Sequence, residues 1–321
     1  MARLKIFFSV LLFFLLNFFT LDKGSSYKSE SVLILGEKQK HIFLKATSLT
    51  ETDDGNIYVV DHYAYRIKMF NNKGTLLKEA GSRGKGKGNF LNMPYLITSY
   101  KNNLAIAEFT SSRVQLFSTN MDYLKSFSVD GIILDISFDH DGNLWLGIMD
   151  PGGKTYLSVY DLRGQRIKKI SLKNNLGKEF EFGSIFVLTV AKTGLVFIAH
   201  TDLNKIEVWN TGGEFVKDFS IGDLPANPEK KVVNYSLFSK KYVPIKKIFQ
   251  DIAVDENGLV YILGGHYSSN PFQDIYVVDH NGAIKRKLTL PEKVSTIYLT
   301  HRNEFLIIDK MGFSVKLYRF K

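Results

Sequence analysis

The chain lacks cysteine, and this absence removes several classes of chemistry. None of its 321 residues is a cysteine, so disulfides, thiolate metal sites, cysteine nucleophiles and a lipidated N-terminal cysteine are excluded. Proline is scarce, with 7 residues against 25 glycines, and 2 tryptophans stand beside 25 phenylalanines and 16 tyrosines. Glycine turns between aromatic segments favour β structure. With 45% hydrophobic and 23% charged residues, the composition is that of a globular protein.

Long hydrophobic runs are also missing, and the longest lies at the N-terminus. Residues 6–19 are interrupted only by Ser9 and Asn17, and they follow Arg3 and Lys5. A basic start before a short apolar run is typical of a secretory signal peptide. The run is shorter than the roughly 17–25 residues that usually span a bilayer. We expect residues 1–26 to be a signal peptide or an uncleaved anchor, and residues 27–321 to form a single exported domain that is periplasmic, extracellular or attached to the cell envelope.

A repeated unit organises the rest of the chain. Its clearest copy has strand-like segments at residues 57–61 and 66–70, with the turns Asp54-Gly55 before them and Asn72-Lys73-Gly74 after them. Such turns supply the positive φ of tight hairpins. Equivalent turns lie 40 to 64 residues apart, at Gly55, Asn102, Gly142, Gly194, Gly258 and Asn303. Four short strands in about 40–50 residues are typical of a propeller blade.

Six copies of the unit predict an all-β, six-bladed β-propeller with four-stranded antiparallel blades. The last copy ends at Lys321 after its third strand, so residues 31–36 are expected to supply the missing outer strand. This N-terminal strand would join the C-terminal blade, close the ring and remove an open sheet edge. We expect the following residues to be buried between blades: Ile57, Val59, Ile67, Phe70, Trp145, Trp209, Val254, Ile262, Ile307 and Leu317.

The repeats resemble the NHL-repeat family of six-bladed β-propellers, in an exported bacterial form. The first copy carries the closest likeness, from Gly55 through Asp61 and Arg66 to Gly74, and residues 81–94 look like the family's glycine-rich link. The resemblance covers nearly the whole chain and weakens after the first copy. It implies the fold and leaves the activity open, because family members include binding scaffolds, RNA-binding modules and a few lyase-type enzymes.

Counting from the turn glycines predicts the position of a candidate site. Innermost strands should begin near Tyr95, Asp135 and Asp251. The antiparallel strands beside them should end at the same face of the ring, and these strands end in the residues Asp61, Glu108, His200 and Asp309. The prediction is therefore an acidic channel mouth on a protein of net charge +10. Carboxylates there could hold Ca²⁺, with Asp135, Asp251 and Asp309 as ligands, or attract a cationic ligand.

A structural role for the same residues is the alternative. Asp61 precedes Arg66, Glu108 precedes Arg113 and His200 precedes Lys205, each by five residues. This shared spacing predicts pairs that fix the loop within each blade. Ser314 takes the equivalent place after Asp309, which leaves that carboxylate freer. Asp135 and Asp251 have no such neighbour, so they either bind a ligand or cap exposed strand-start amides.

Three further segments have simpler interpretations than binding sites. The stretch from Gly81 to Gly88 lacks the Gly-Lys-Ser/Thr and strand–helix context of a phosphate loop, so it is expected to link two blades. Residues 139–143 superficially resemble a calcium loop, but the acid expected seven positions after Gly142 is instead Met149, so they predict a hairpin turn. The lysine-rich insertion at 222–247 could contact an acidic polymer or a membrane surface, but a solvated loop is the preferred interpretation.

The leading functional hypothesis is an exported, monomeric, non-enzymatic scaffold that binds an envelope protein, peptide or glycan. No cofactor is expected apart from a possible Ca²⁺, no nucleic acid is expected, and membrane contact would come only through an uncleaved N-terminal segment. The alternative is a secreted metal-dependent lyase or hydrolase with its site at the channel mouth. Its ligands would be Asp135, Asp251 and Asp309, with His200 or Tyr95 transferring a proton.

Overall fold

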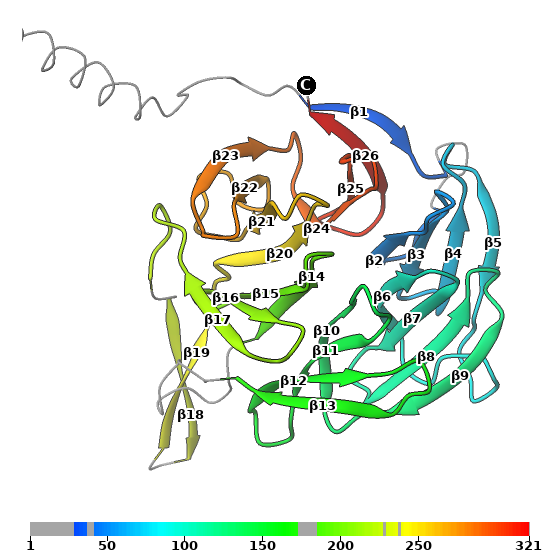
Figure 1. Ribbon diagram of the computed structural model, residues 1–321, viewed down its shortest axis with the longest axis horizontal. Coiled ribbons are helices and arrows are strands. Elements are labelled where there is room, and N and C mark those ends of the chain that lie inside the picture. Colours follow the sequence, from blue (N-terminus) through cyan, green and yellow to red (C-terminus); the bar gives the residue numbers. More distant parts are fainter. Residues whose placement is uncertain (1–28, 37–41, 173–184, 227–228, 237–238, 321) are drawn as a thin grey trace, which may run out of the picture.

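The structure is a ring of six antiparallel β-sheets, as the repeats predict (Figure 1). This computed structural model describes residues 29–36, 42–172, 185–226, 229–236 and 239–320. The described residues form strands, turns and loops, and no helix occurs among them. Each blade has four strands, and the first strand of each blade lines the centre of the ring. The prediction of a six-bladed β-propeller is confirmed.

The blades follow one another along the chain, and the strands of each blade run in order from the centre of the ring outwards. Blade 1 comprises β2 (Ala46–Glu51), β3 (Ile57–Asp61), β4 (Arg66–Phe70) and β5 (Leu76–Ala80). Blade 2 comprises β6 (Pro94–Tyr100), β7 (Asn103–Glu108), β8 (Arg113–Ser118) and β9 (Tyr123–Ser128). Blade 3 comprises β10 (Ile132–Phe138), β11 (Leu144–Met149), β12 (Thr155–Tyr160) and β13 (Arg166–Ser171).

The second half of the ring repeats this order. Blade 4 comprises β14 (Phe186–Val190), β15 (Leu195–His200), β16 (Ile206–Asn210) and β17 (Phe215–Phe219). Blade 5 comprises β20 (Phe249–Val254), β21 (Val260–Gly264), β22 (Asp274–Val278) and β23 (Ile284–Thr289). Blade 6 comprises β24 (Val294–Leu299), β25 (Phe305–Asp309), β26 (Val315–Phe320) and β1 (Ser29–Ile34).

The two ends of the chain meet in blade 6 and close the ring. β1 pairs antiparallel with β26, with Ser29 opposite Phe320 and Ile34 opposite Lys316 (Figure 1). The outer strand of the last blade therefore comes from the N-terminus, as predicted. Residues 1–28, on which the signal-peptide prediction falls, lie outside the described residues.

The lysine-rich insertion between blades 4 and 5 contains a β-hairpin. Strand β18 (Lys230–Ser236) pairs with β19 (Ser239–Pro244), with Lys230 opposite Pro244. The hairpin extends away from the ring (Figure 1). The interpretation of this segment as a loop was therefore wrong for residues 230–236 and 239–244, which form strands.

Aspartates fix many of the turns that separate the strands. Asp139 Oδ1 accepts hydrogen bonds from the amides of Asp141 and Asn143, and its Oδ2 accepts one from the indole of Trp145. Gly142 follows with φ of 84°, a conformation that a residue with a Cβ rarely adopts. The predicted hairpin turn at 139–143 is confirmed, and its aspartate also anchors a core tryptophan.

The hydrophobic core lies between neighbouring blades. One apolar cluster joins Val59 and Phe70 of blade 1 to Leu306 of blade 6, and another joins Ile67 of blade 1 to Ile106 of blade 2. Of the ten residues predicted to be buried, nine are buried. The exception, Val254, is half-buried because its inner strand borders the central channel.

Candidate functional site

The central channel opens on two different faces of the ring. We call the face where the inner strands begin and the second strands end the start face, and the face with the hairpin turns between those strands the turn face. A cavity of about 530 Å³ opens towards the turn face. A smaller one of about 150 Å³ opens towards the start face. Asp135 and Asp251 line both cavities, so they lie at the waist of the channel.

The waist carboxylates connect inner strands of neighbouring blades. Asp135 Oδ2 accepts a hydrogen bond of 2.7 Å from the amide of Leu188, one blade further on. Asp251 Oδ2 accepts one of 2.9 Å from the amide of Ile297. Ser48 Oγ accepts one of 3.1 Å from Ile97 in the same way. Polar side chains of blades 1, 3 and 5 therefore hold the inner strands of blades 2, 4 and 6.

Burial brings the pKa values of both waist carboxyls close to physiological pH. Burial, together with the charge of Asp251, raises the pKa of Asp135 to about 8. Hydrogen bonds from two backbone amides lower it, but by less. Burial likewise raises the pKa of Asp251 to about 7, against two amides and the charge of Lys247. Burial and these two aspartates also raise the pKa of Tyr95. Of the predicted site residues, these three are the ones that the structure brings together.

Asp61 and Glu108 form buried pairs within their blades and do not face the channel mouth. Asp61 lies 2.9 Å from Lys68 Nζ and accepts hydrogen bonds from the amides of Leu44 and Lys45. The predicted partner was wrong, because Arg66 donates instead to the carbonyl of Gly81. For Glu108 the predicted pair with Arg113 is confirmed, at 3.1 Å.

His200 and Asp309 also have structural partners. His200 Nε2 lies 3.2 Å from Glu207 Oε1, and Lys205 Nζ lies 2.6 Å from the same oxygen. Lys205 is therefore not the partner of His200, and both contact Glu207. Asp309 accepts hydrogen bonds from the amides of Met311 and Gly312 and from Ser314. It closes its own turn, so the expectation of a freer carboxylate was wrong.

The predicted acidic mouth is therefore not formed. Asp61 and Glu108 are paired inside their blades. Asp309 caps a turn, and Asp135 and Asp251 connect inner strands at the channel waist. Asp309 is not part of a shared site with Asp135 and Asp251. Among the residues that the structure describes, no three His, Asp or Glu side chains are grouped as metal ligands.

Lysines occupy the start face where acids were predicted. Lys45 precedes β2, Lys247 precedes β20, Lys293 precedes β24 and Lys310 follows β25. Burial, together with the charges of the other three lysines, lowers the pKa of Lys310 to about 8. The mouth on this side is therefore basic.

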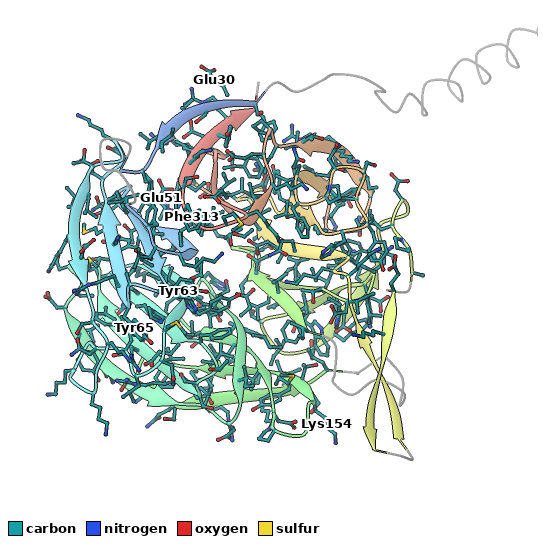
Figure 2. All side chains as sticks on the ribbon, turned by 180° about the vertical axis from the view of Figure 1, so that it is seen from behind. Glu30, Glu51, Tyr63, Tyr65, Lys154 and Phe313 are labelled. Atoms are coloured by element: carbon teal, nitrogen blue, oxygen red, sulfur yellow. The ribbon has the colours of Figure 1, made fainter. Side chains whose placement is uncertain are left out.

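Large apolar side chains surround this basic mouth. Nine are between 39% and 59% exposed in the loops and strand ends of the start face: Leu44, Tyr63, Leu91, Phe109, Ile132, Ile185, Ile245, Met311 and Phe313. They come from all six blades. Figure 2 labels Tyr63 and Phe313, which extend from the loops after β3 and β25.

Part of this apolar rim is a preformed aromatic cluster. The ring centroids of Tyr95 and Phe109 are 5.2 Å apart, and the ring of His62 lies 5.4 Å from Phe109 and 5.1 Å from Tyr63. His62 Nδ1 lies 2.9 Å from the carbonyl oxygen of Pro94, which orients the ring. The exposed aromatic rings of Tyr63 and Phe109 thus pack against the buried ring of His62.

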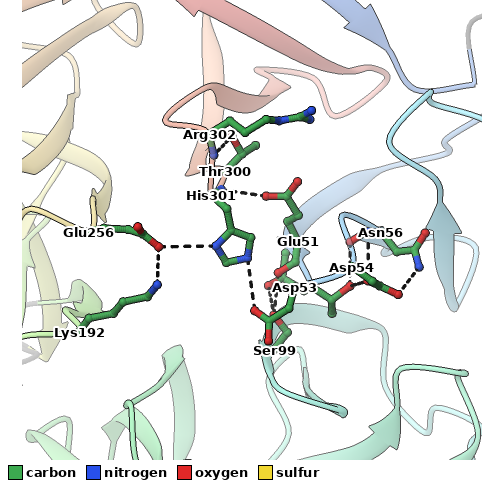
Figure 3. A network of polar contacts seen from close by, with 12 residues as sticks. Glu51, Asp53, Asp54, Asn56, Ser99, Lys192, Glu256, Thr300, His301 and Arg302 are labelled. Carbon is green, nitrogen blue, oxygen red and sulfur yellow. Dashed lines mark hydrogen bonds and ion pairs between the residues drawn. The ribbon is translucent and has the colours of Figure 1, made fainter.

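The turn face carries a network of polar contacts between neighbouring blades (Figure 3). His301 Nε2 lies 3.6 Å from Asp53, and its Nδ1 lies 4.0 Å from Glu256. Lys192 pairs with the same Glu256. The network links blades 4, 5, 6 and 1 at the larger cavity, so these polar side chains already engage one another.

The sequence interpretation missed the lysines and the apolar rim. Its count from the turn glycines stopped at the strand ends, and eight of the nine apolar residues lie one to four positions beyond them. An apolar residue in a predicted loop of each blade was the available signal.

Comparison with known proteins identifies the family. Residues 31–221 match the DUF5128 family, described as a 6-bladed beta-propeller. The chain belongs to this family. No curated protein matches this DUF5128 chain.

Solved structures share the fold of the DUF5128 chain at low sequence identity. Virginiamycin B lyase from Staphylococcus aureus has a TM-score of 0.58 at 12% identity, covering 91% of this chain and 99% of its own. A luciferin-regenerating enzyme has a TM-score of 0.58 at 9% identity, covering 92% and 95%. A chain of a mitotic checkpoint complex has a TM-score of 0.60 at 8% identity, covering 92% and 94%. Within its described part, the DUF5128 chain has no helix with the length and hydropathy to span a bilayer.

Proposed function

We propose that this DUF5128 propeller is an exported, NHL-like, non-enzymatic scaffold that binds a protein of the cell envelope on its start face. The observation that carries the proposal is the set of nine exposed large apolar side chains around the basic channel mouth. Apolar groups gathered on one face of a soluble protein mark interaction sites.

Charge complementarity defines the partner. The lysines near the mouth favour a protein surface that carries carboxylates, and the aromatic cluster of Tyr63, Tyr95 and Phe109 favours apolar side chains among them. We therefore propose an acidic protein segment with apolar anchors as the occupant.

The channel chemistry supports a scaffold over a metal-dependent lyase. Both waist aspartates accept backbone amides with each of their oxygens. Asp309, the third proposed ligand, is used by its own turn. The similar solved structures include enzymes and a checkpoint complex and therefore favour neither function.

The test is site-directed crosslinking in the cell envelope with matched variants. A photo-crosslinking residue at position 109 should capture a defined partner. Combining it with Tyr63→Ser and Phe313→Ser should reduce capture about 10-fold or more, because exposed aromatic anchors dominate interface energies.

The control is the pair Leu77→Ser and Leu124→Ser, which are 52% and 48% exposed on outer strands. This control should leave capture unchanged. Equal loss in both pairs, or no loss in either, would show that the start face is not the docking surface.

A further inference from the structure

A cluster of four lysines lies where blades 5, 6 and 1 meet on the start face. Backbone hydrogen bonds hold its loops together. The amide of Lys310 donates to the carbonyl of Lys293 at 2.9 Å. Lys45 Nζ donates to the carbonyl of Met311 at 2.7 Å. In blade 5, the amide of His266 donates to the carbonyl of Lys247 at 2.8 Å.

Lys310 at the centre of the cluster rests on an aromatic ring. Its Nζ lies 3.5 Å from the ring centroid of Phe272, a residue only 7% exposed. The ring of His266 packs against the same phenylalanine at 4.8 Å. His266 Nδ1 accepts the amide of Lys247 at 3.0 Å, so this nitrogen carries no proton. The ammonium group of Lys310 is therefore placed by packing, and the residue is partly exposed.

The cluster has more positive than negative charge. Among the described residues, none of the four lysines forms an ion pair within 4.0 Å. Asp202 and Asp251 act on Lys247 only as more distant charges, and the carboxylate of Asp309 is engaged by its turn. The charges of Lys247, Lys45 and Lys293 add to burial in lowering the pKa of Lys310, and those of Lys310, Lys246 and Lys247 add to burial in lowering that of His266.

We infer that this lysine cluster is an oxyanion site, and that its ligand is a carboxylate group on the protein partner. The inference rests on the proposed docking function and deepens it by naming the group that the mouth recognises. An oxyanion between lysines forms charge-assisted hydrogen bonds and offsets their mutual repulsion.

The position of the cluster favours a projecting group over a flat surface. Lys45, Lys247 and Lys310 are partly buried between loops. Beside them opens the recess of about 150 Å³, whose lining includes Lys247, Thr201 and Gln250 together with the buried carboxyls of Asp135 and Asp251 at the waist. A cavity of this size accommodates a group as large as a benzene ring, so a side chain fits. A membrane surface would meet the exposed apolar rim before reaching these ammonium groups.

The experiment measures anion binding to the full chain without a partner. Lysines carrying ¹³C-methyl labels report each titration by NMR, with acetate, a glutamate-rich peptide, inorganic phosphate or vesicles of anionic lipid as probes. The peptide should raise the titration midpoint of Lys310 by about one pH unit, because a bound anion favours the ammonium form. Peptide binding should therefore weaken above about pH 8.

Two variants and a control complete the test. Lys310→Met and, separately, Lys45→Met should each weaken peptide binding about 10-fold or more, while circular dichroism confirms the fold. Lys125→Met, exposed on outer strand β9, should bind normally. An unmoved Lys310 titration, or normal binding by both cluster variants, would overturn the site. Binding of phosphate or vesicles without the peptide would overturn the carboxylate assignment.

The probes contain no partner protein, so the two proposals fail separately. A silent Lys310 titration with intact crosslinking would remove the oxyanion site and leave the docking face. Normal peptide binding with unaffected crosslinking in Tyr63→Ser and Phe313→Ser would remove the docking face and leave the oxyanion site.

Discussion

At the residue scale, Asp135 and Asp251 make stability depend on pH in an unusual direction. The pKa of Asp135 rises from 3.8 to about 8 on folding, so the unfolded chain loses this proton first as the pH increases. Their contribution to the unfolding free energy is therefore greatest below pH 3.8 and declines up to about pH 8. Asp135→Asn mimics the protonated form, and its melting temperature should fall less than that of the native chain between about pH 5 and pH 8.

The size of the domain determines how far a change in the unfolding free energy shifts the melting temperature. Each kcal/mol corresponds to about 2–4 °C in a large domain, so calorimetry at the two pH values resolves it. Asp122→Asn, an exposed substitution, should retain the native pH dependence. An identical pH dependence in Asp135→Asn and the native chain would contradict the buried-carboxyl account.

Glu207 provides the opposite case. Burial raises its pKa, but hydrogen bonds from His200 and Lys205 outweigh burial and hold it at about 2. Its stabilising effect is present above pH 4.5 and is lost as the pH falls through about 2. Glu207→Gln should lower the free energy of unfolding by about 2–4 kcal/mol near neutral pH, because Lys205 loses a buried carboxylate and His200 loses its partner.

Denaturant unfolding followed by tryptophan fluorescence measures this loss, since Trp209 Nε1 donates to Glu207. The difference between Glu207→Gln and the native chain should shrink below about pH 3. A constant difference down to that pH would mean that packing, and not charge, causes the loss.

The residue pairs show where sequence spacing was sufficient and where it was not. A spacing of five gave the correct partner for Glu108 alone. The shared spacing is seven: Asp61 with Lys68, Glu108 with Gln115, and His200 with Glu207. Side chains two residues apart on a strand share a face, so the fifth and seventh positions compete, and only the three-dimensional path of each side chain decides.

At the element scale, β1 is the strand on which ring closure depends. A chain that begins at residue 35 lacks β1 and leaves β26 unpaired on its outer side. It should melt at a lower temperature and self-associate, because an open strand edge pairs with other chains. Light scattering coupled to size exclusion measures the association, and a chain that begins at residue 28 is the control. A monomeric, equally stable truncated chain would show that β1 is dispensable.

The hairpin β18–β19 should contribute little to stability. At its base, among the described residues, Glu229 pairs with Lys246, and the amide of Glu229 donates to the hydroxyl of Tyr267. Replacing residues 230–244 with a short glycine–serine linker should change the unfolding free energy by less than about 1 kcal/mol, since long surface insertions carry a small entropic cost. Thermal melting measures this. A drop of several degrees would reveal packing against the ring.

The elements of the blades were predictable and the hairpin was not, for a physical reason. Blade strands are bounded by Asp-Gly and Asn-Gly turns and bury apolar residues, so local signals agree with packing. The hairpin carries lysines at 230, 231, 240 and 241, and lysine is depleted in strands, so the local signal for a strand was weak.

At the scale of the whole molecule, the export hypothesis has a direct test. Residues 1–26 fused to a reporter enzyme that needs disulfides should give activity, because such a reporter folds only outside the cytoplasm. Replacing residues 10–13 of the apolar run with charged residues should abolish it. Activity retained by this variant would contradict export through the N-terminal segment.

The architecture was predictable from the sequence because the same pattern of turns and strands recurs in each blade. The site was not, because it belongs to no single repeat. Lys45, Lys247, Lys293 and Lys310 are separated by up to 265 positions and come together only when three blades meet. The positions of charged residues along the chain could not show that the acids are paired inside the blades while the lysines lie at the channel mouth.

The pairing of β1 with β26 also determines the order of events during synthesis. The first described strand, β1, cannot pair until the last strand, β26, has been synthesised, since Ser29 pairs with Phe320. Contacts between such distant residues form slowly, so a nascent chain can stack its early blades but cannot lock the ring until its final residues are available. Under the export hypothesis, this delay keeps the chain open for longer before it crosses the membrane. A protease that removes a few C-terminal residues would return the finished ring to that open state.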